Sequence, residues 1–238
     1  MIEEKKAMNW QRSLLFLLAF VIVGSASAQD TLKANADSVT LKFENDRVRV
    51  LESALKPGAK ENEHSHPNYV TYVISGGKVR NHSGGTVSLG EFKTGEVLFR
   101  DARTHWSENI GKTTTQVVMF ELRDVKDAGE PYKISLDMDP VKLSPQFYKV
   151  LVDNEYVRVL EYRLKPGQKE PKHSHPCGVV YYLTGTTWRT SSPDGKTTES
   201  ETTAGTVVWR DPITHAAENV GKTDARAIAI EFKGPCGK

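Results

Sequence analysis

The chain has 238 residues, 32 Lys and Arg against 30 Asp and Glu, and a formal net charge of +2 at pH 7. This near-neutral charge gives no electrostatic basis for binding nucleic acid or a membrane surface. Two cysteines exclude a fold built on a network of disulfides, although an exported chain could join Cys177 to Cys236.

Residues 1–28 are typical of a secretory signal peptide. A basic start up to Arg12 is followed by an apolar run from Leu14 to Val23 and by a small-x-small cleavage site that ends at Ala28. The apolar run is about ten residues, short of the roughly 20 that a membrane-spanning helix needs. We therefore expect a secreted or periplasmic mature chain that has no membrane segment.

The rest of the chain is a tandem duplication with a period near 110 residues. Identities recur in the same order, in the pairs Asn45–Glu52 and Asn154–Glu161, Leu55–Gly58 and Leu164–Gly167, and His64–Pro67 and His173–Pro176. This period is too long for a solenoid repeat and indicates a duplicated domain. We expect units at 38–123 and 146–234, joined by a Pro- and Gly-containing linker over 124–145.

The composition of both units favours strands. Short β-branched and aromatic runs are separated by Gly or Pro turns, and the clearest runs are 48–51, 69–74, 97–99, 157–160, 179–183 and 207–209. Many short strands at regular spacing are typical of an all-β sandwich or barrel. No helical period of useful length appears after residue 28.

Six of the seven histidines form two matching sets, and imidazole is the commonest side-chain ligand of transition metals. In a strand, residues i and i+2 project to the same face, so the His-Ser-His pairs project together and a third histidine from a distant strand completes each set. The sequence therefore predicts two metal sites, with the ligands His64, His66 and His105, and His173, His175 and His215.

These motifs resemble those of the cupin superfamily. Its first motif, Gly-x5-His-x-His, is matched from Gly58 and from Gly167, and the ending of its second, His-x3-Asn, is matched at His105 and His215. The second motif opens at Gly95 and Gly205, one residue closer to the histidine than is common, and lacks the usual Pro-x-Gly. The resemblance implies an all-β chain of two tandem cupin barrels, each a double-stranded β-helix or jelly roll.

One departure from the family bears on function. Most metal-binding cupins supply a Glu three or four residues after His-x-His, where this chain has Val70-Thr71 and Val179-Val180. The pattern is therefore a three-histidine site, which is similar to the sites of thiol dioxygenases and of a diketone-cleaving dioxygenase. The resemblance implies dioxygenase-like oxygen chemistry on a small chelating substrate.

Three neutral imidazoles leave a divalent ion with its full +2 charge, which favours an anionic ligand such as an enolate, thiolate or carboxylate. The ligand set does not identify the metal. Nitrogen ligands and folding outside the cytoplasm favour Cu and Zn by affinity, while Mn, Ni and Fe also fit.

Four further residues are candidates for substrate binding. Arg80 and Arg189 correspond between the repeats and would bind a carboxylate if they line the barrel; the alternative is an outward-facing position. Tyr72 and Tyr181 share the parity of the histidines and would offer a phenol to the pocket; the alternative is aromatic filling of the barrel.

Other polar residues have structural interpretations. We expect Asp101 and Asp211 to form surface ion pairs with the adjacent arginines; the alternatives are a bond to a ligand histidine and a role as general base. Asn109 and Asn219 fit turn positions, and His82 fits an exposed loop. Cys177 is either a residue near the metal or, as we expect, buried or disulfide-bonded.

Three functions follow. The first is an exported metalloenzyme that acts on a small anionic molecule. The second is a non-catalytic cupin that binds a ligand or a metal, and the third is a structural module in which the histidines bond internally. Cupin barrels often pair through their sheets, so a homodimer is compatible with the resemblance, and the substrate stays open because one barrel type supports many chemistries.

Overall fold

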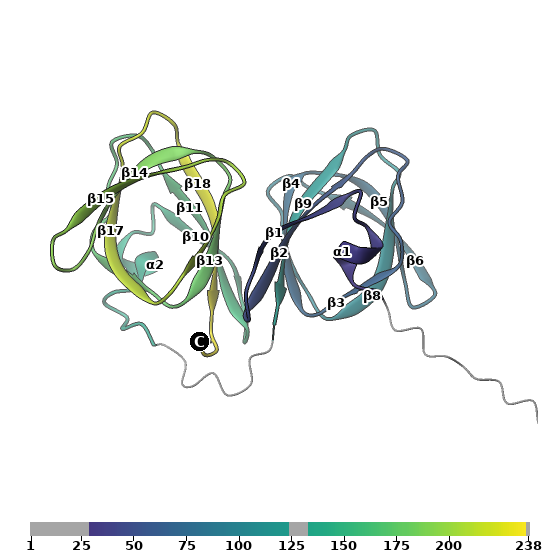
Figure 1. Ribbon diagram of the computed structural model, residues 1–238, viewed down its shortest axis with the longest axis horizontal. Helices are drawn as coiled ribbons and strands as arrows, with labels where there is room; N and C mark the ends of the chain where they lie inside the picture. The colour runs from purple at the N-terminus through teal and green to yellow at the C-terminus, as the bar shows by residue number, and fades with distance from the viewer. Residues whose placement is uncertain (1–28, 124–132, 237–238) are drawn as a thin grey trace, which may run out of the picture.

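The computed structural model describes residues 29–123 and 133–236 and forms two β-barrels that lie side by side (Figure 1). The all-β expectation is confirmed, because the only helices in the described ranges are two short ones, α1 (Thr31–Ala34) and α2 (Pro140–Leu143). The expected signal peptide, 1–28, and the first part of the expected linker lie outside the described residues.

Each barrel is made of one five-stranded and one four-stranded antiparallel sheet. In the first barrel the strand orders are β1-β2-β9-β4-β7 and β3-β8-β5-β6. The strands are β1 (Val39–Glu44), β2 (Val48–Leu55), β3 (His64–His66), β4 (Tyr69–Ser75), β5 (Gly77–Ser83), β6 (Thr86–Phe92), β7 (Val97–Arg100), β8 (Arg103–Asn109) and β9 (Thr115–Leu122).

The second barrel repeats this topology in the orders β10-β11-β18-β13-β16 and β12-β17-β14-β15. Its strands are β10 (Tyr148–Asp153), β11 (Val157–Leu164), β12 (His173–His175), β13 (Gly178–Tyr182), β14 (Thr186–Ser191), β15 (Thr197–Thr202), β16 (Val207–Arg210), β17 (Ile213–Asn219) and β18 (Ala225–Phe232). The sequence duplication is therefore a duplication of one fold.

Each barrel is preceded by one of the short helices, and both helices begin with a capping aspartate. Asp30 accepts hydrogen bonds from two backbone amides at the start of α1, and Asp139 accepts one at the start of α2. The helices lie against the strands that carry the His-Ser-His motifs, β3 and β12. α2 belongs to the described part of the segment that we expected to be a linker.

The central strands of the two five-stranded sheets are buried on both faces. One face of each contributes to a single hydrophobic cluster that joins the barrels, with members that include Val50, Tyr72, Val118, Phe120, Val159, Val179, Tyr181, Ile228 and Ile230. The opposite faces line the barrel interiors. This explains why β9 and β18 are near-continuous apolar runs, as is typical of strands that are covered on both sides.

Several contacts bridge the barrels beyond this cluster. The rings of Phe99 and Tyr156 stack with centroids 5.6 Å apart, and the guanidinium of Arg47 lies 5.1 Å from the ring centroid of Phe232. No helix within 29–123 or 133–236 is long and apolar enough to cross a membrane.

Candidate metal centres

Each histidine triad is assembled by one pair of short strands. β3 pairs with β8 so that His64 lies opposite His105, and β12 pairs with β17 so that His173 lies opposite His215. His66 and His175 project to the same side two residues later. In each triad the three ligand nitrogens lie within 4.8 Å of one another, so the structure brings together all six histidines that the sequence singled out.

The hydrogen bonds of the first triad fix the histidine tautomers. His64 Nδ1 donates to the carbonyl oxygen of Asn62 at 2.7 Å, and His66 Nδ1 donates to Glu121 Oε1 at 2.6 Å. In a neutral ring that donates from Nδ1, Nε2 is unprotonated and free to bind a metal, and these two nitrogens lie 2.9 Å apart. Two lone pairs at this distance repel each other unless a cation lies between them.

The second triad has the same arrangement. His173 Nδ1 donates to the Pro171 carbonyl at 2.8 Å, His175 Nδ1 donates to Glu231 Oε1 at 2.6 Å, and the two Nε2 atoms are 2.8 Å apart. Among the described residues, Nε2 of His105 and of His215 is buried without a hydrogen-bond partner. A metal ion satisfies all three nitrogens at once, so both donor sets fit a transition metal.

Burial lowers the pKa of five of the six triad histidines. It lowers the pKa of His105 to about 3 and that of His215 to about 2, with the neighbouring histidines adding to the effect. Burial also lowers the pKa of His64 and His173. At neutral pH a metal therefore does not have to displace protons from these ligands.

In each triad, one ligand histidine is held by a series of charged groups that begins at its Nδ1, the ring nitrogen that faces away from the metal position. Glu121, which accepts from His66, also accepts from Arg49 Nε at 2.6 Å, and Arg49 Nη1 donates to the helix-capping Asp30 at 2.5 Å. Burial raises the pKa of Glu121, but the bonds from His66 and Arg49 lower it overall. A carboxylate behind a ligand histidine fixes the ring orientation and raises its basicity.

The second barrel contains the same series in corresponding residues. Glu231 accepts from Arg158 Nε at 2.7 Å, and Arg158 Nη1 donates to Asp139 at 2.7 Å. Neither series of hydrogen-bonded groups was predicted from the sequence. The available signal was a glutamate inside an otherwise apolar strand, at the same position of both repeats.

A cavity of about 160 Å³ opens beside the first triad. Its wall is mixed: Arg100, Arg103, Asn81 and Ser107 line it together with the histidines, and so do apolar side chains such as Phe92, Leu98 and Met119. The ring of Tyr69 stacks on His66 with centroids 4.5 Å apart. The cavity therefore places positive charge beside the predicted metal position.

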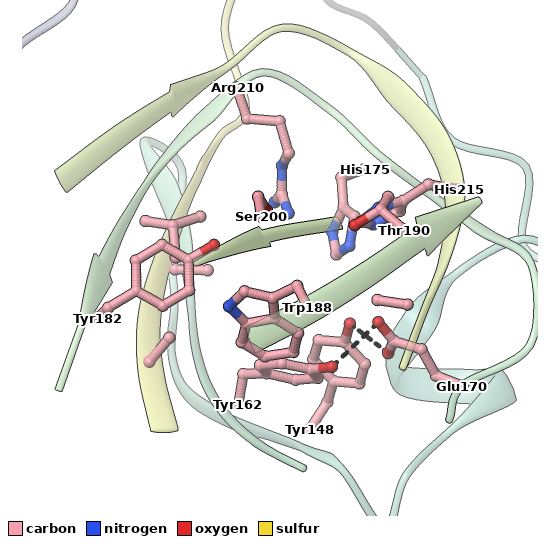
Figure 2. A pocket seen from close by; sticks show the side chains of 14 residues that line it. Tyr148, Tyr162, Glu170, His175, Tyr182, Trp188, Thr190, Ser200, Arg210 and His215 are labelled. Carbon is pink, nitrogen blue, oxygen red and sulfur yellow. Dashed lines mark hydrogen bonds between the residues drawn. The ribbon is translucent and has the colours of Figure 1, made fainter. Parts of the chain in front are cut away.

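A smaller cavity, about 110 Å³, lies beside the second triad (Figure 2). Figure 2 shows His175 and His215 on one side, the Arg210 side chain on another and the Trp188 ring between them and the tyrosines. Tyr148, Tyr162 and Tyr182 complete an aromatic wall. The two cavities share triad histidines, an arginine and a glutamate, and differ in most of the rest of their lining.

A glutamate that the sequence did not single out faces each cavity: Glu61 is half-buried, and Glu170 is buried. Glu61 and Glu170 stand three residues before the first histidine of each motif, whereas the family pattern directed attention to the positions after it. Glu170 accepts from the hydroxyls of Tyr148 at 2.8 Å and Tyr162 at 3.1 Å, and its Oε1 lies 3.8 Å from His173 Nε2. Burial raises the pKa of Glu61, and it raises that of Glu170 to about 7 despite the tyrosine hydrogen bonds.

Arg80 and Arg189, expected to bind a substrate, do not line either cavity. Arg80 Nη1 pairs with Glu108 at 2.6 Å, and Arg189 pairs with Glu199 at 2.8 Å and with Glu218 at 3.3 Å. Their side chains are 40% and 43% exposed. They lie on the outward-facing side of β5 and β14, which is the alternative that the sequence left open.

Tyr72 and Tyr181 also lie outside the two triad cavities, in the hydrophobic cluster between the barrels. The expected parity with the histidines does not extend to them, because β3 and β4 are separate strands in different sheets, as are β12 and β13. The side chains of β4 and β13 that line the cavities lie on the other face of these strands, Tyr69 and Thr71 in the first barrel and Val180 and Tyr182 in the second.

The remaining candidates have structural roles. Cys177 is joined to Cys236 by a disulfide with the Cα atoms 5.5 Å apart, as expected. Asn109 donates to the carbonyls of Leu55 and Thr113, and Asn219 makes the equivalent bonds.

Two structural expectations were wrong. Asp101 and Asp211 are exposed, but the adjacent Arg100 and Arg210 line the cavities rather than pairing with them. His82 is in β5 and stacks on Trp106 with centroids 3.6 Å apart, so it is not an exposed loop residue.

Comparison with known proteins finds solved structures with a similar fold. No protein-family model and no curated protein matches this sequence. Among solved structures, AerE from Microcystis aeruginosa is similar with a TM-score of 0.60 and 15% identity, over 82% of this chain and 92% of AerE. Oxalate decarboxylase from Bacillus subtilis, a bicupin studied for its Mn(II) centres, is similar with a TM-score of 0.55 and 15% identity, over 83% of this chain and 72% of that one.

The fold is a bicupin. The same oxalate decarboxylase at pH 4.6 gives a TM-score of 0.55 at 16% identity, over 86% of this chain and 71% of that one. Identities this low show the architecture alone. The expectation of two tandem cupin barrels is confirmed, and the bicupin carries two triads with metal-binding geometry.

The first prediction concerns Glu121, the carboxylate that accepts a hydrogen bond from His66. Glu121→Gln removes the negative charge that holds His66 and Arg49, so metal affinity at the first triad should fall roughly 10- to 100-fold. We would measure it by competition between the protein and a chromophoric zinc chelator, in a chain whose second triad is removed by His173→Ala and His215→Ala.

Glu108→Gln is the matched control. It removes a carboxylate that pairs with Arg80 on the outside of β8, the strand that carries His105. Affinity should be unchanged in this variant. An equal loss in both variants would show that the charge behind His66 has no specific effect on the metal.

The metal-free protein should lose stability as the pH falls from 6.5 to 5. An unfolded histidine binds a proton near pH 6.5, whereas folded His105 has its pKa lowered to about 3, so the unfolded state takes up more protons in this range. Each such histidine lowers the free energy of unfolding by up to about 1.4 kcal/mol per pH unit.

The measurement is urea unfolding at several pH values in the presence of a chelator. His105→Gln cannot titrate and should give a shallower pH dependence than the unsubstituted chain. Parallel profiles for the two proteins would contradict the shifted pKa.

Proposed function

We propose that this bicupin is an exported metalloenzyme that binds a divalent transition metal in each triad and carries out dioxygenase-like chemistry on a small anionic, chelating molecule. The proposal rests on one observation. In each barrel a histidine triad, an arginine and a glutamate face the same cavity.

The charges of the cavity favour an anionic substrate. The three imidazoles are neutral and leave the full charge of a divalent ion, to which Arg210 adds one positive charge in the second barrel and Arg100 and Arg103 add two in the first. Guanidinium groups bind carboxylates with two parallel hydrogen bonds, which also orients the substrate.

Glu61 and Glu170 can hold or accept a proton next to the substrate. Both line the cavity, and Oε2 of Glu61 is buried without a hydrogen-bond partner in the described part of the chain. Oε1 and Oε2 of Glu170 are oriented by two tyrosine hydroxyls. A carboxylate in this position can take a proton from a ligand that binds as an enolate or phenolate.

A bound metal supplies charge stabilisation and, if it is redox-active, electrons for oxygen chemistry. The residues that would hold it are the six triad histidines, with Glu121 and Glu231 fixing the orientation of His66 and His175.

Metal analysis and oxygen uptake test the proposal. The mature chain should bind two metal ions, His64→Ala with His105→Ala should leave one, and removal of both triads should leave none. With Fe²⁺, Mn²⁺, Ni²⁺ or Cu²⁺ loaded, oxygen consumption on a panel of diketones, thiols and phenolic acids should require at least one intact triad.

His82→Ala is the control, because His82 is the one histidine of the seven outside the triads. It should leave both metals and oxygen consumption unchanged. Failure to bind Zn²⁺, Cu²⁺ or Fe²⁺ at the triads would sink the metalloenzyme, and metal binding without turnover of any compound would favour the non-catalytic binding protein instead.

Export is supported by the disulfide between Cys177 and Cys236, since such bonds form and persist in oxidising compartments. Mass spectrometry of the exported chain should give the mass of residues 29–238 with both thiols oxidised. A chain that stays in the cytoplasm with residues 1–28 attached would refute this part of the proposal.

A further inference from the structure

The second cavity differs from the first by its aromatic wall. Tyr148, Tyr162, Tyr182 and Trp188 line it, and the Tyr162 and Trp188 rings stack with centroids 5.9 Å apart. The first barrel has Val39, Ser53, Val73 and Val79 at the corresponding positions, as the matching strand registers show. The aromatic wall therefore belongs to one barrel and is not a requirement of the fold.

Most polar atoms of this wall are already bonded to protein groups. The hydroxyls of Tyr148 and Tyr162 donate to Glu170, and Trp188 Nε1 donates to Thr202 Oγ1 at 3.0 Å. Small residues also line the cavity: Ala227 pairs with Tyr162 and Tyr182 across the sheet, and Ala217 and Ala229 are the other two. What the wall offers to a ligand is therefore the apolar faces of rings, with the alanines leaving room beside them.

One charged group in this cavity lacks a hydrogen-bond partner. Nε and Nη2 of Arg210 are buried and, within the described residues, bond to no acceptor; the nearest acidic atom, Glu231 Oε1, lies 3.9 Å from Nη2. Glu231 is already bonded to His175 and Arg158. Buried donors are nearly always satisfied, so an anionic group of a ligand is the natural partner of Arg210.

We infer that the second barrel binds a flat aromatic carboxylate, with the ring against Trp188 and the tyrosines and the carboxylate on Arg210. The inference deepens the proposed function, on which it rests, by naming the substrate class of one barrel. A cavity of about 110 Å³ limits the ligand to a single ring, since an engineered cavity of about 150 Å³ holds one benzene.

The first barrel provides an internal contrast. Its cavity also has apolar side chains such as Phe92 and Leu98, but it contains two arginines, and Asn81 and Ser107 stand where the second barrel has Thr190 and Ala217. A ligand ring there lacks the stacking partners that the aromatic wall provides in the second barrel. The same ligand should therefore distinguish the two barrels, although both have a triad.

The test uses the zinc-loaded mature chain, because zinc is redox-inert and the probe is not consumed. The probe is salicylate, an aromatic carboxylate with a neighbouring hydroxyl. Calorimetric titration is run with salicylate, with cyclohexanecarboxylate, which has the carboxylate but no flat ring, and with oxalate, which chelates but has no ring. Salicylate should bind the second barrel at least 10-fold more tightly than either comparison compound.

Matched arginine variants locate the site. Arg210→Met should weaken salicylate binding roughly 10- to 100-fold, the loss expected for one charged hydrogen-bonded pair, whereas Arg100→Met, at the corresponding position of the first barrel, should leave it unchanged. Arg210→Lys should restore part of the affinity. Zinc stoichiometry and urea unfolding of each variant establish that it is folded and loaded.

Trp188 gives a second readout that a purely structural role would not produce. Salicylate should change the tryptophan fluorescence of the unsubstituted chain, and Trp188→Phe should abolish that change while retaining most of the affinity. Equal binding of the three compounds, or a loss with Arg100→Met but not with Arg210→Met, would overturn the inference while two bound zinc ions leave the proposed function intact. Absence of zinc from both triads would instead overturn the proposed function.

Discussion

The structure depends on two five-stranded sheets that are covered on both faces. One face of each packs against the other barrel, and the opposite face lines a cavity, so consecutive residues on β9 and β18 serve different purposes. Phe120 and Ile230 join the barrels, while Glu121 and Glu231 turn inward and hold a ligand histidine. Neighbouring residues in a strand alternate between faces. A shift of register by one residue would therefore put these glutamates into the apolar interface and leave His66 and His175 without their hydrogen-bond acceptors.

The fold and the triads could be predicted from sequence because both rest on local patterns that are repeated. Strand runs, the His-x-His spacing and the duplication each involve a few adjacent residues. Tyr72 and Tyr181 were misplaced because the chain changes sheet between β3 and β4 and between β12 and β13, and parity does not cross such a break. Glu61 and Glu170 were missed for a different reason. Their approach to the histidines depends on how the chain enters the short strand, which no periodicity reports.

The two barrels show how one framework supports different chemistry. The groups that fix the metal position are the same in both: a triad, a glutamate behind it, an arginine and a capping aspartate. The groups that face the remainder of the cavity differ, with two arginines among mixed polar and apolar residues in one barrel and a wall of four aromatic rings in the other. This separation is physically reasonable, because metal geometry tolerates little change, whereas a cavity wall can exchange volume between facing side chains as long as the interior stays filled.

The capping aspartates have a consequence for folding order. Asp30 precedes the first strand of its barrel and Glu121 lies on the last one, yet both bond to Arg49 behind His66, and Asp139, Glu231 and Arg158 do the same in the second barrel. The support for the metal is thus complete only when the beginning and the end of each half have met. A nascent or truncated half-chain would display the His-Ser-His motif but hold its rings loosely, so tight metal retention serves as a signature that the barrel has closed.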